Sequence, residues 1–176
     1  MDYQGKKCLI AYFSHAGMNY VSGKIVDLPV GNTERAAQML RLFTGGDLFH
    51  IRTASVYPND YQEVVKIARK EKADNARPAL EKDLPSIDDY DVIFLGYPNW
   101  CGTMPTAVST FLTETPFRNV TIHPLCTSGG SGMANSEADI QKLCPVAVLR
   151  PGLLVAAKAT RAPETEAAIR KWVAEG

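Results

Sequence analysis

The sequence has no excess charge of either sign and no long apolar run, and we expect no secretory leader. Among its 176 residues, 19 lysines and arginines balance 19 aspartates and glutamates. This balance argues against a nucleic-acid-binding protein, which would carry a basic excess. No apolar run reaches the length of a membrane span, and residues 1–7 lack the apolar segment of a signal peptide. We therefore expect a cytoplasmic protein with no membrane partner and no nucleic-acid partner.

The four cysteines form no recognisable metal or disulfide pattern. Cys8, Cys101, Cys126 and Cys144 include no Cys-x-x-Cys pair and show no metal-ligand spacing with the three histidines. Reduced thiols in a cytoplasmic protein are the simplest interpretation. No arginine follows Cys8 or Cys101 at the spacing of a protein-phosphatase loop. We expect no metal site, and we read Cys101 as a small apolar filler rather than a redox thiol.

Two common nucleotide motifs are also missing. Residues 17–24 look superficially like a P-loop, but they have one residue too many between the glycines. Ile25 also stands where a P-loop has a magnesium-binding Ser or Thr. No Gly-x-Gly-x-x-Gly follows the first expected strand, so the dinucleotide fingerprint is absent.

Apolar runs alternate with segments of helical periodicity along the whole chain. Strands are expected at residues 7–13, 48–53, 92–97, 120–126 and 153–156. Two helices are expected to be capped by Asn32 or Thr33 and by Asn135 or Ser136, and three more are expected to begin at Asp60, Pro105 and Pro163. This alternation predicts right-handed βαβ units and a parallel sheet between two helical layers, an α/β fold. The chain has no repeat and no long linker, so we expect one domain over residues 1–176.

Polar or glycine-rich loops follow three of these strands. Ser14–Ala16 follow the first strand, and Gly31–Thr33 open the next helix. A helix N-terminus offers free N–H groups and a positive dipole end, which suit a phosphate. Pro98–Thr103, with the aromatic Trp100, and Thr127–Gly132 follow two further strands. Because the carboxyl ends of parallel strands share one edge of the sheet, the loops predict a joint site for a flat ligand with an anionic tail.

An insertion separates the first strand from the first helix. Residues 17–30 are longer than such a connection requires, and apolar residues flank Ser22-Gly23-Lys24. The pattern predicts a small hairpin that turns at Ser22-Gly23. Two interpretations stay open for it: a surface excursion without chemistry, or a flap over the bound ligand.

These stretches together resemble the flavodoxin-like flavoproteins, in particular a bacterial subgroup with an enlarged first loop. The matching segments are residues 9–14, 31–34, 57–58 with 60–61, 96–98 with 100 and 102–105, and 127–132, and the resemblance spans nearly the whole chain. It implies a flavodoxin-like three-layer sandwich with a five-stranded parallel sheet of order 2-1-3-4-5, non-covalently bound FMN, and redox chemistry. The cofactor-binding residues expected from the loops and the resemblance are Ser14, His15, Ala16, Gly31, Asn32, Thr33, Pro98, Asn99, Trp100, Cys101, Gly102, Thr103, Thr127, Ser128, Gly129 and Gly130.

The chain departs from the subgroup pattern at two of these positions. His15 stands where the subgroup usually has Arg, so phosphate attraction is expected to be weaker and dependent on pH. Cys101 stands where a second Trp is usual, so part of the aromatic wall is expected to be missing. Gly102, next to it, is expected to let the peptide beside the flavin reorient.

Three functions fit this pattern. The first is an FMN-binding protein in electron transfer, which acts with a redox partner protein or a small-molecule electron acceptor. The second is an enzyme, an FMN-dependent NAD(P)H:quinone-type oxidoreductase. The third is a binding module without flavin. Neutral net charge favours the enzyme slightly, whereas short length and the family resemblance favour the electron carrier.

Overall fold

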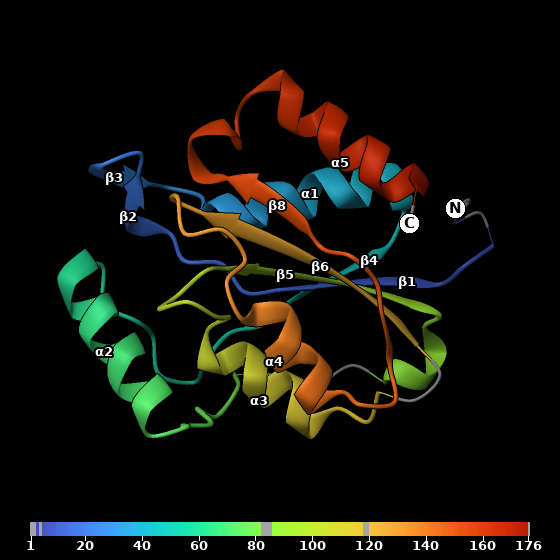
Figure 1. The fold of residues 1–176 in the computed structure, drawn as a ribbon, viewed down its shortest axis with the longest axis horizontal. Coiled ribbons are helices and arrows are strands. Elements are labelled where there is room, and N and C mark those ends of the chain that lie inside the picture. Colours follow the sequence, from blue (N-terminus) through green and yellow to red (C-terminus); the bar gives the residue numbers. More distant parts are fainter. Residues whose placement is uncertain (1–2, 4, 82–85, 118–119, 176) are drawn as a thin grey trace.

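A six-stranded parallel sheet runs through the middle of the molecule (Figure 1). The computed structural model describes residues 3, 5–81, 86–117 and 120–175. The strands of this sheet are β1 (Cys8–Tyr12), β4 (Asp47–His50), β5 (Val92–Pro98), β6 (Thr121–Ser128), β7 (Val148–Leu149) and β8 (Leu153–Ala156). They are ordered β4-β1-β5-β6, and β7 and β8 both pair with β6. With β7 and β8 counted as one interrupted strand, this is the predicted order 2-1-3-4-5.

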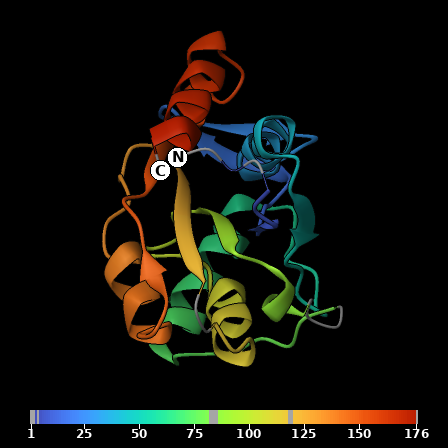
Figure 2. The same cartoon turned by 90° about the vertical axis from the view of Figure 1, so that its right-hand side faces the viewer.

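Helices cover both faces of the sheet and complete three layers (Figures 1 and 2). The helices α1 (Asn32–Thr44) and α5 (Pro163–Glu175) lie on one face, and α3 (Thr106–Glu114) and α4 (Ser136–Leu143) lie on the other. The helix α2 (Tyr61–Ala73) lies on the α3 side, near the carboxyl ends of the strands. Short 3-10 turns occur at Ile87–Asp89 and Ala157–Ala159. None of the helices in the described part of the chain is long and apolar enough to cross a membrane.

The strand β1 is apolar along its whole length because both of its faces are buried. Leu9 and Ala11 pack into the core under α3 and α4, whereas Cys8, Ile10 and Tyr12 pack into the core under α1 and α5. All five side chains are buried. A strand covered by helices on both sides has no polar face, as predicted for a central parallel strand.

The insertion after β1 forms the predicted hairpin. Its strands are β2 (Gly17–Val21) and β3 (Lys24–Leu28), which pair in antiparallel fashion. Ser22 and Gly23 form the turn with φ of 49° and 86°. Positive φ at both central residues matches the twist of a two-residue hairpin.

Several expected boundaries differ from the structure; for example, Thr127 and Ser128, which were expected in a loop, are the last residues of β6. The strand expected at residues 48–53 is β4, Asp47–His50, and Thr53 instead forms an isolated bridge with Leu80. The last strand is split, because Pro151 lacks an N–H for the ladder, and only its second half was expected. The first helix is not capped by Asn32 or Thr33, since Gly31 is its N-cap residue.

Candidate functional site

The three loops expected to bind a ligand do converge at one edge of the sheet. They border a single cleft of about 740 Å³ between the hairpin and α2. Thr33, Trp100 and Gly129, one from each loop, all line this cleft. Its volume lies within the usual range for cofactor sites, roughly 300–1,000 Å³.

Hydrogen bonds tie the three loops to one another. The hydroxyls of Thr33 and Thr127 are 2.8 Å apart in a buried contact that joins the first loop to the third. The N–H of Asn99 donates to the carbonyl of Thr127 at 2.8 Å, and its side-chain amide donates to the carbonyl of Gly132 at 2.7 Å. The cleft is thus a preorganised structure rather than a chance gap between independent loops.

The N-terminus of α1 forms one end of the cleft. Among the described residues, the backbone N–H groups of Asn32 and Thr33 have no hydrogen-bond acceptor. The N–H of Glu34 donates to Ser14 Oγ at 3.0 Å. Ser14 therefore caps the helix, although we expected its hydroxyl to face the ligand. The two remaining N–H groups and the helix dipole suit an anion such as a phosphate.

His15 lies beside this helix end and borders the cleft. Its Nε2 atom is buried and has no partner among the described residues. Burial disfavours the charged imidazolium and lowers the pKa of His15 below its ordinary value. A buried nitrogen without a partner is costly, and an anionic oxygen in the cleft would satisfy it.

Trp100 forms the aromatic wall at the other end of the cleft. Its ring meets the rings of Phe13 and Tyr57 edge-on, with centroid distances of 5.1 Å in both cases. The ring of His15 lies 5.9 Å away at an angle of 73°. Tyr57 is in turn fixed by its hydroxyl, which donates to Glu71 Oε2 at 2.9 Å. These contacts hold the indole in place while part of it remains exposed to the cleft.

Residues 100–103 form a tight two-residue hairpin, and each peptide group within it makes at least one hydrogen bond. Trp100 and Thr103 exchange backbone hydrogen bonds of 2.8 and 3.2 Å. Between them, the carbonyl of Cys101 accepts from Lys72 Nζ at 2.5 Å, and the N–H of Gly102 donates to Asn99 Oδ1 at 3.0 Å. The expected reorientation of the Cys101–Gly102 peptide would break both of these last hydrogen bonds.

Cys101 itself adopts a strained conformation. Its φ is 55°, and that of Gly102 is 82°. The side chain is half-buried and lines the cleft, where the sequence predicts a cofactor-binding residue. A left-handed conformation costs a residue with a Cβ roughly 1–2 kcal/mol, although asparagine tolerates it better.

We therefore expect Cys101→Asn to raise the free energy of unfolding of the apoprotein by about 0.5–1 kcal/mol, because Asn-Gly is a favoured pair for such turns. Urea denaturation measures the change. Cys101→Ala is the matched control, since it removes the thiol but keeps the backbone penalty. Equal stability of the two variants would contradict the strain argument.

The structure places most of the expected site residues on the cleft. Twelve of them line it: His15, Asn32, Thr33, Pro98, Asn99, Trp100, Cys101, Gly102, Thr127, Ser128, Gly129 and Gly130. Four do not: Ser14 and Ala16 border a neighbouring cavity, Thr103 borders another, and Gly31 lies beneath the first loop. Their assignment as cofactor-binding residues stays a prediction.

The residues that form the outer walls of the cleft were not among the cofactor-binding residues expected from the sequence. The additional lining residues are Met18, Asn19 and Tyr20 of the hairpin, Tyr61, Val64, Val65, Ala68 and Arg69 of α2, and Ser131 and Ala157. The hairpin reaches across the cleft, because Tyr20 stacks on Tyr61 at 6.4 Å and covers Gly129. A Cβ on Gly129 would lie 2.7 Å from Tyr20 Cδ1. This arrangement favours the flap interpretation of residues 17–30.

Comparison with known proteins agrees with this geometry. A family model described as flavodoxin matches residues 7–175. The chain is 32% identical to a protein assigned as a flavoprotein from Bacteroides eggerthii, with a TM-score of 0.77 and 97% of each chain covered. A second such protein, from Bacteroides uniformis, is 27% identical with a TM-score of 0.75, and the match covers 96% of this chain and 98% of that one. No curated protein sequence matches the chain.

The fold and the site are those of a flavodoxin-like flavoprotein, and the chain belongs to the flavodoxin family. A flavoprotein from Lactobacillus acidophilus, whose structure was solved in complex with FMN, shares the fold at 20% identity with a TM-score of 0.64 over 88% of this chain and 95% of that one. Family membership supports FMN as the cofactor.

The chemistry of the described cleft residues also suits FMN, independently of the comparison with known proteins. The unpartnered N–H groups of Asn32 and Thr33 and the buried Nε2 of His15 suit its phosphate. The Trp100 ring and the glycine-bearing loop at Ser128–Gly130 suit a flat ring system.

Proposed function

We propose that this protein is an FMN-dependent electron-transfer flavoprotein. The convergence of three strand-end loops on one cleft, with a free helix N-terminus at one end and an indole at the other, carries this proposal. Bound FMN supplies reversible electron uptake, and the protein supplies binding, orientation and electrostatics.

The N-terminus of α1 and the Trp100 wall would bind different parts of FMN. The N–H groups of Asn32 and Thr33 would hold the phosphate through the dipole of α1, and His15 would complete its coordination. Trp100 and the 100–103 turn would hold the ring against one wall and exclude water from it. An apolar wall of this kind disfavours negative charge on the reduced ring, and the nearby ammonium of Lys72 opposes that effect.

Titration of the purified apoprotein with FMN tests this function. We expect the flavin absorption spectrum to shift and the flavin fluorescence to be quenched at a stoichiometry of one FMN per chain. Trp100→Ala should weaken binding about tenfold, as expected for loss of about 1–1.5 kcal/mol of aromatic contact. Absence of binding at millimolar FMN would overturn the proposal and leave the flavin-free binding module.

A reductase that acts on a small molecule is the second candidate. A second cavity directly behind the Trp100 wall favours it, because a pure electron carrier does not need a second binding site. Steady-state oxidation of NAD(P)H with a quinone separates the two functions. A carrier shows almost no turnover without its partner protein, whereas a reductase turns over alone.

A further inference from the structure

The second cavity lies directly beside the main cleft. It has a volume of about 330 Å³, and Trp100 and Ala68 border both spaces. The turn at residues 100–103 separates them, and Lys72 bridges from α2 to its tip. The two cavities are therefore neighbours along α2, divided by one aromatic ring and one tight turn.

One face of α2 lines both cavities in succession. Tyr61, Val64 and Ala68 face the cleft, and Ala68, Glu71 and Lys72 continue into the second cavity. Spacings of three and four residues place these positions on one side of the helix. Only Val64 and Ala68 of this helix are buried, so α2 serves as a wall of binding sites more than as a core element.

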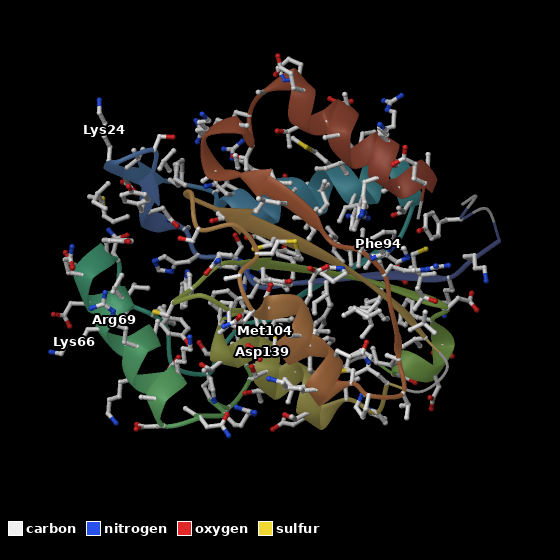
Figure 3. The ribbon with its side chains drawn as sticks, viewed as in Figure 1. Lys24, Lys66, Arg69, Phe94, Met104 and Asp139 are labelled. Carbon is white, nitrogen blue, oxygen red and sulfur yellow. The ribbon has the colours of Figure 1, made fainter. Side chains whose placement is uncertain are left out.

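The second cavity combines apolar surface with positive charge. Met104, Pro105 and Leu143 supply apolar surface. Lys72, Arg77 and Lys142 supply three positive charges, against the two carboxylates of Glu71 and Asp139. Figure 3 shows Met104 and Asp139 close together near α3 and α4.

Both carboxylates are already engaged by the protein. Glu71 Oε2 accepts from the hydroxyls of Tyr57 and Thr106, at 2.9 and 2.6 Å. Asp139 accepts from the hydroxyl of Thr103 at 2.7 Å and pairs with Lys142 at 3.4 Å.

Arg77 and Lys72 have no acidic partner in the part of the chain that the structure describes. Among the described residues, Arg77 donates only to neutral oxygens of Asn75 and Ala76, and Lys72 donates only to the Cys101 carbonyl. The cavity therefore has a net positive charge and unused donors, which suit a phosphate, carboxylate or sulfonate group.

We propose that this cavity is an anion-binding subsite for the redox substrate, which receives the charged tail of an aromatic electron donor or acceptor. This inference rests on the second form of the proposed redox function, a reductase that acts on a small molecule, because the substrate's reactive part would lie at the FMN cleft on the other side of Trp100. Arg77, which has no acidic partner among the described residues, would bind the anionic group, and Lys142, whose contact with Asp139 is 3.4 Å long, would add its positive charge. Met104 and Leu143 would contact the apolar part that links the anionic group to the ring. The substrate class is a small anionic aromatic molecule, either a phosphorylated nicotinamide dinucleotide or an anionic quinone.

Calorimetric titration of the FMN-loaded protein tests the subsite with two probes, NADP⁺ and 1,4-naphthoquinone-2-sulfonate. We expect at least one probe to bind and the variant Arg77→Gln/Lys142→Gln to bind it at least tenfold more weakly at low salt. The probe that binds identifies the source of the anionic group. Neutral 2-methyl-1,4-naphthoquinone should bind the wild type and the variant equally.

The matched control is Lys66→Gln/Lys70→Gln, which removes two charges from α2 outside the cavity. Lys66 points away from the protein body (Figure 3), and Lys70 pairs with Asp74. This control should bind the probe within about twofold of the wild type, and FMN affinity should be unchanged in both variants. Failure of both probes to bind the wild type, or equal weakening in both double variants, would overturn the subsite. Failure of the wild type to bind FMN would instead overturn the proposed redox function.

Discussion

Replacing Gly31 with alanine is expected to weaken FMN binding about 100-fold, equivalent to about 2.7 kcal/mol. An ideal Cβ at this position would lie 2.2 Å from Ser14 Oγ and 2.6 Å from the carbonyl oxygen of His15. The His15 carbonyl is backbone, so the loop after β1 would have to move away from the helix end. That movement would separate His15 from the N–H groups of Asn32 and Thr33 and break the Ser14–Glu34 cap.

The same clash is expected to lower the free energy of unfolding by about 1–3 kcal/mol, the usual cost of overpacking. FMN affinity is measured by fluorescence quenching at a temperature where circular dichroism shows the variant to be folded. Gly23→Ala is the control, because Gly23 lies at the hairpin tip and a Cβ added there would meet nothing within 4 Å. Its φ of 86° makes alanine strained there, so the control loses stability without entering the site. FMN affinity in Gly31→Ala within threefold of the wild type would contradict this account of the helix end.

The sequence predicted the part of the site that depends on strand ends. Trp100 follows the buried strand β5 and Thr127 lies at the carboxyl end of β6, and parallel strands bring their carboxyl ends to one edge whatever the loops contain. The cleft-lining positions of Thr33, Trp100 and Gly129 therefore followed from the order of elements. The hairpin also followed from local pattern, since Ser22-Gly23 between apolar residues favours a tight turn.

The part that depends on tertiary packing could not be predicted in this way. Charged residues dominate positions 66–72, a pattern that predicts a solvated helix face. The structure instead places Arg69 on the cleft and Lys72 on the second cavity. A charged helix that borders a binding site has the same local pattern as one that borders water, and only the position of α2 beside the 100–103 turn distinguishes them. The capping role of Ser14 could not be predicted for a similar reason, because its hydrogen bond with the N–H of Glu34 depends on how α1 approaches β1.

His15→Arg is expected to tighten FMN binding about tenfold at pH 8. The side chain of His15 borders the cleft next to the N-terminus of α1, and burial lowers its pKa below the ordinary value. At pH 8 the imidazole is therefore neutral and contributes only a neutral hydrogen bond to a phosphate. Arginine keeps its charge throughout, and a hydrogen bond to a charged group contributes about 1.5–3 kcal/mol against about 1 kcal/mol for a neutral one.

The two side chains also differ in how FMN affinity responds to pH. A bound phosphate favours the imidazolium and raises the pKa of His15 above its value in the free protein, so binding takes up a proton. Wild-type affinity should therefore increase as the pH falls from 8 through the bound-state pKa, and it should level off below the lowered pKa of the free protein. Protonation of the phosphate itself, with a pKa near about 6, is common to all variants and cancels in the comparison. His15→Arg and the neutral control His15→Gln should both lose the histidine-dependent part of this increase, with high affinity in the first and low affinity in the second. A pH profile of His15→Gln parallel to that of the wild type would show that His15 does not contact the phosphate.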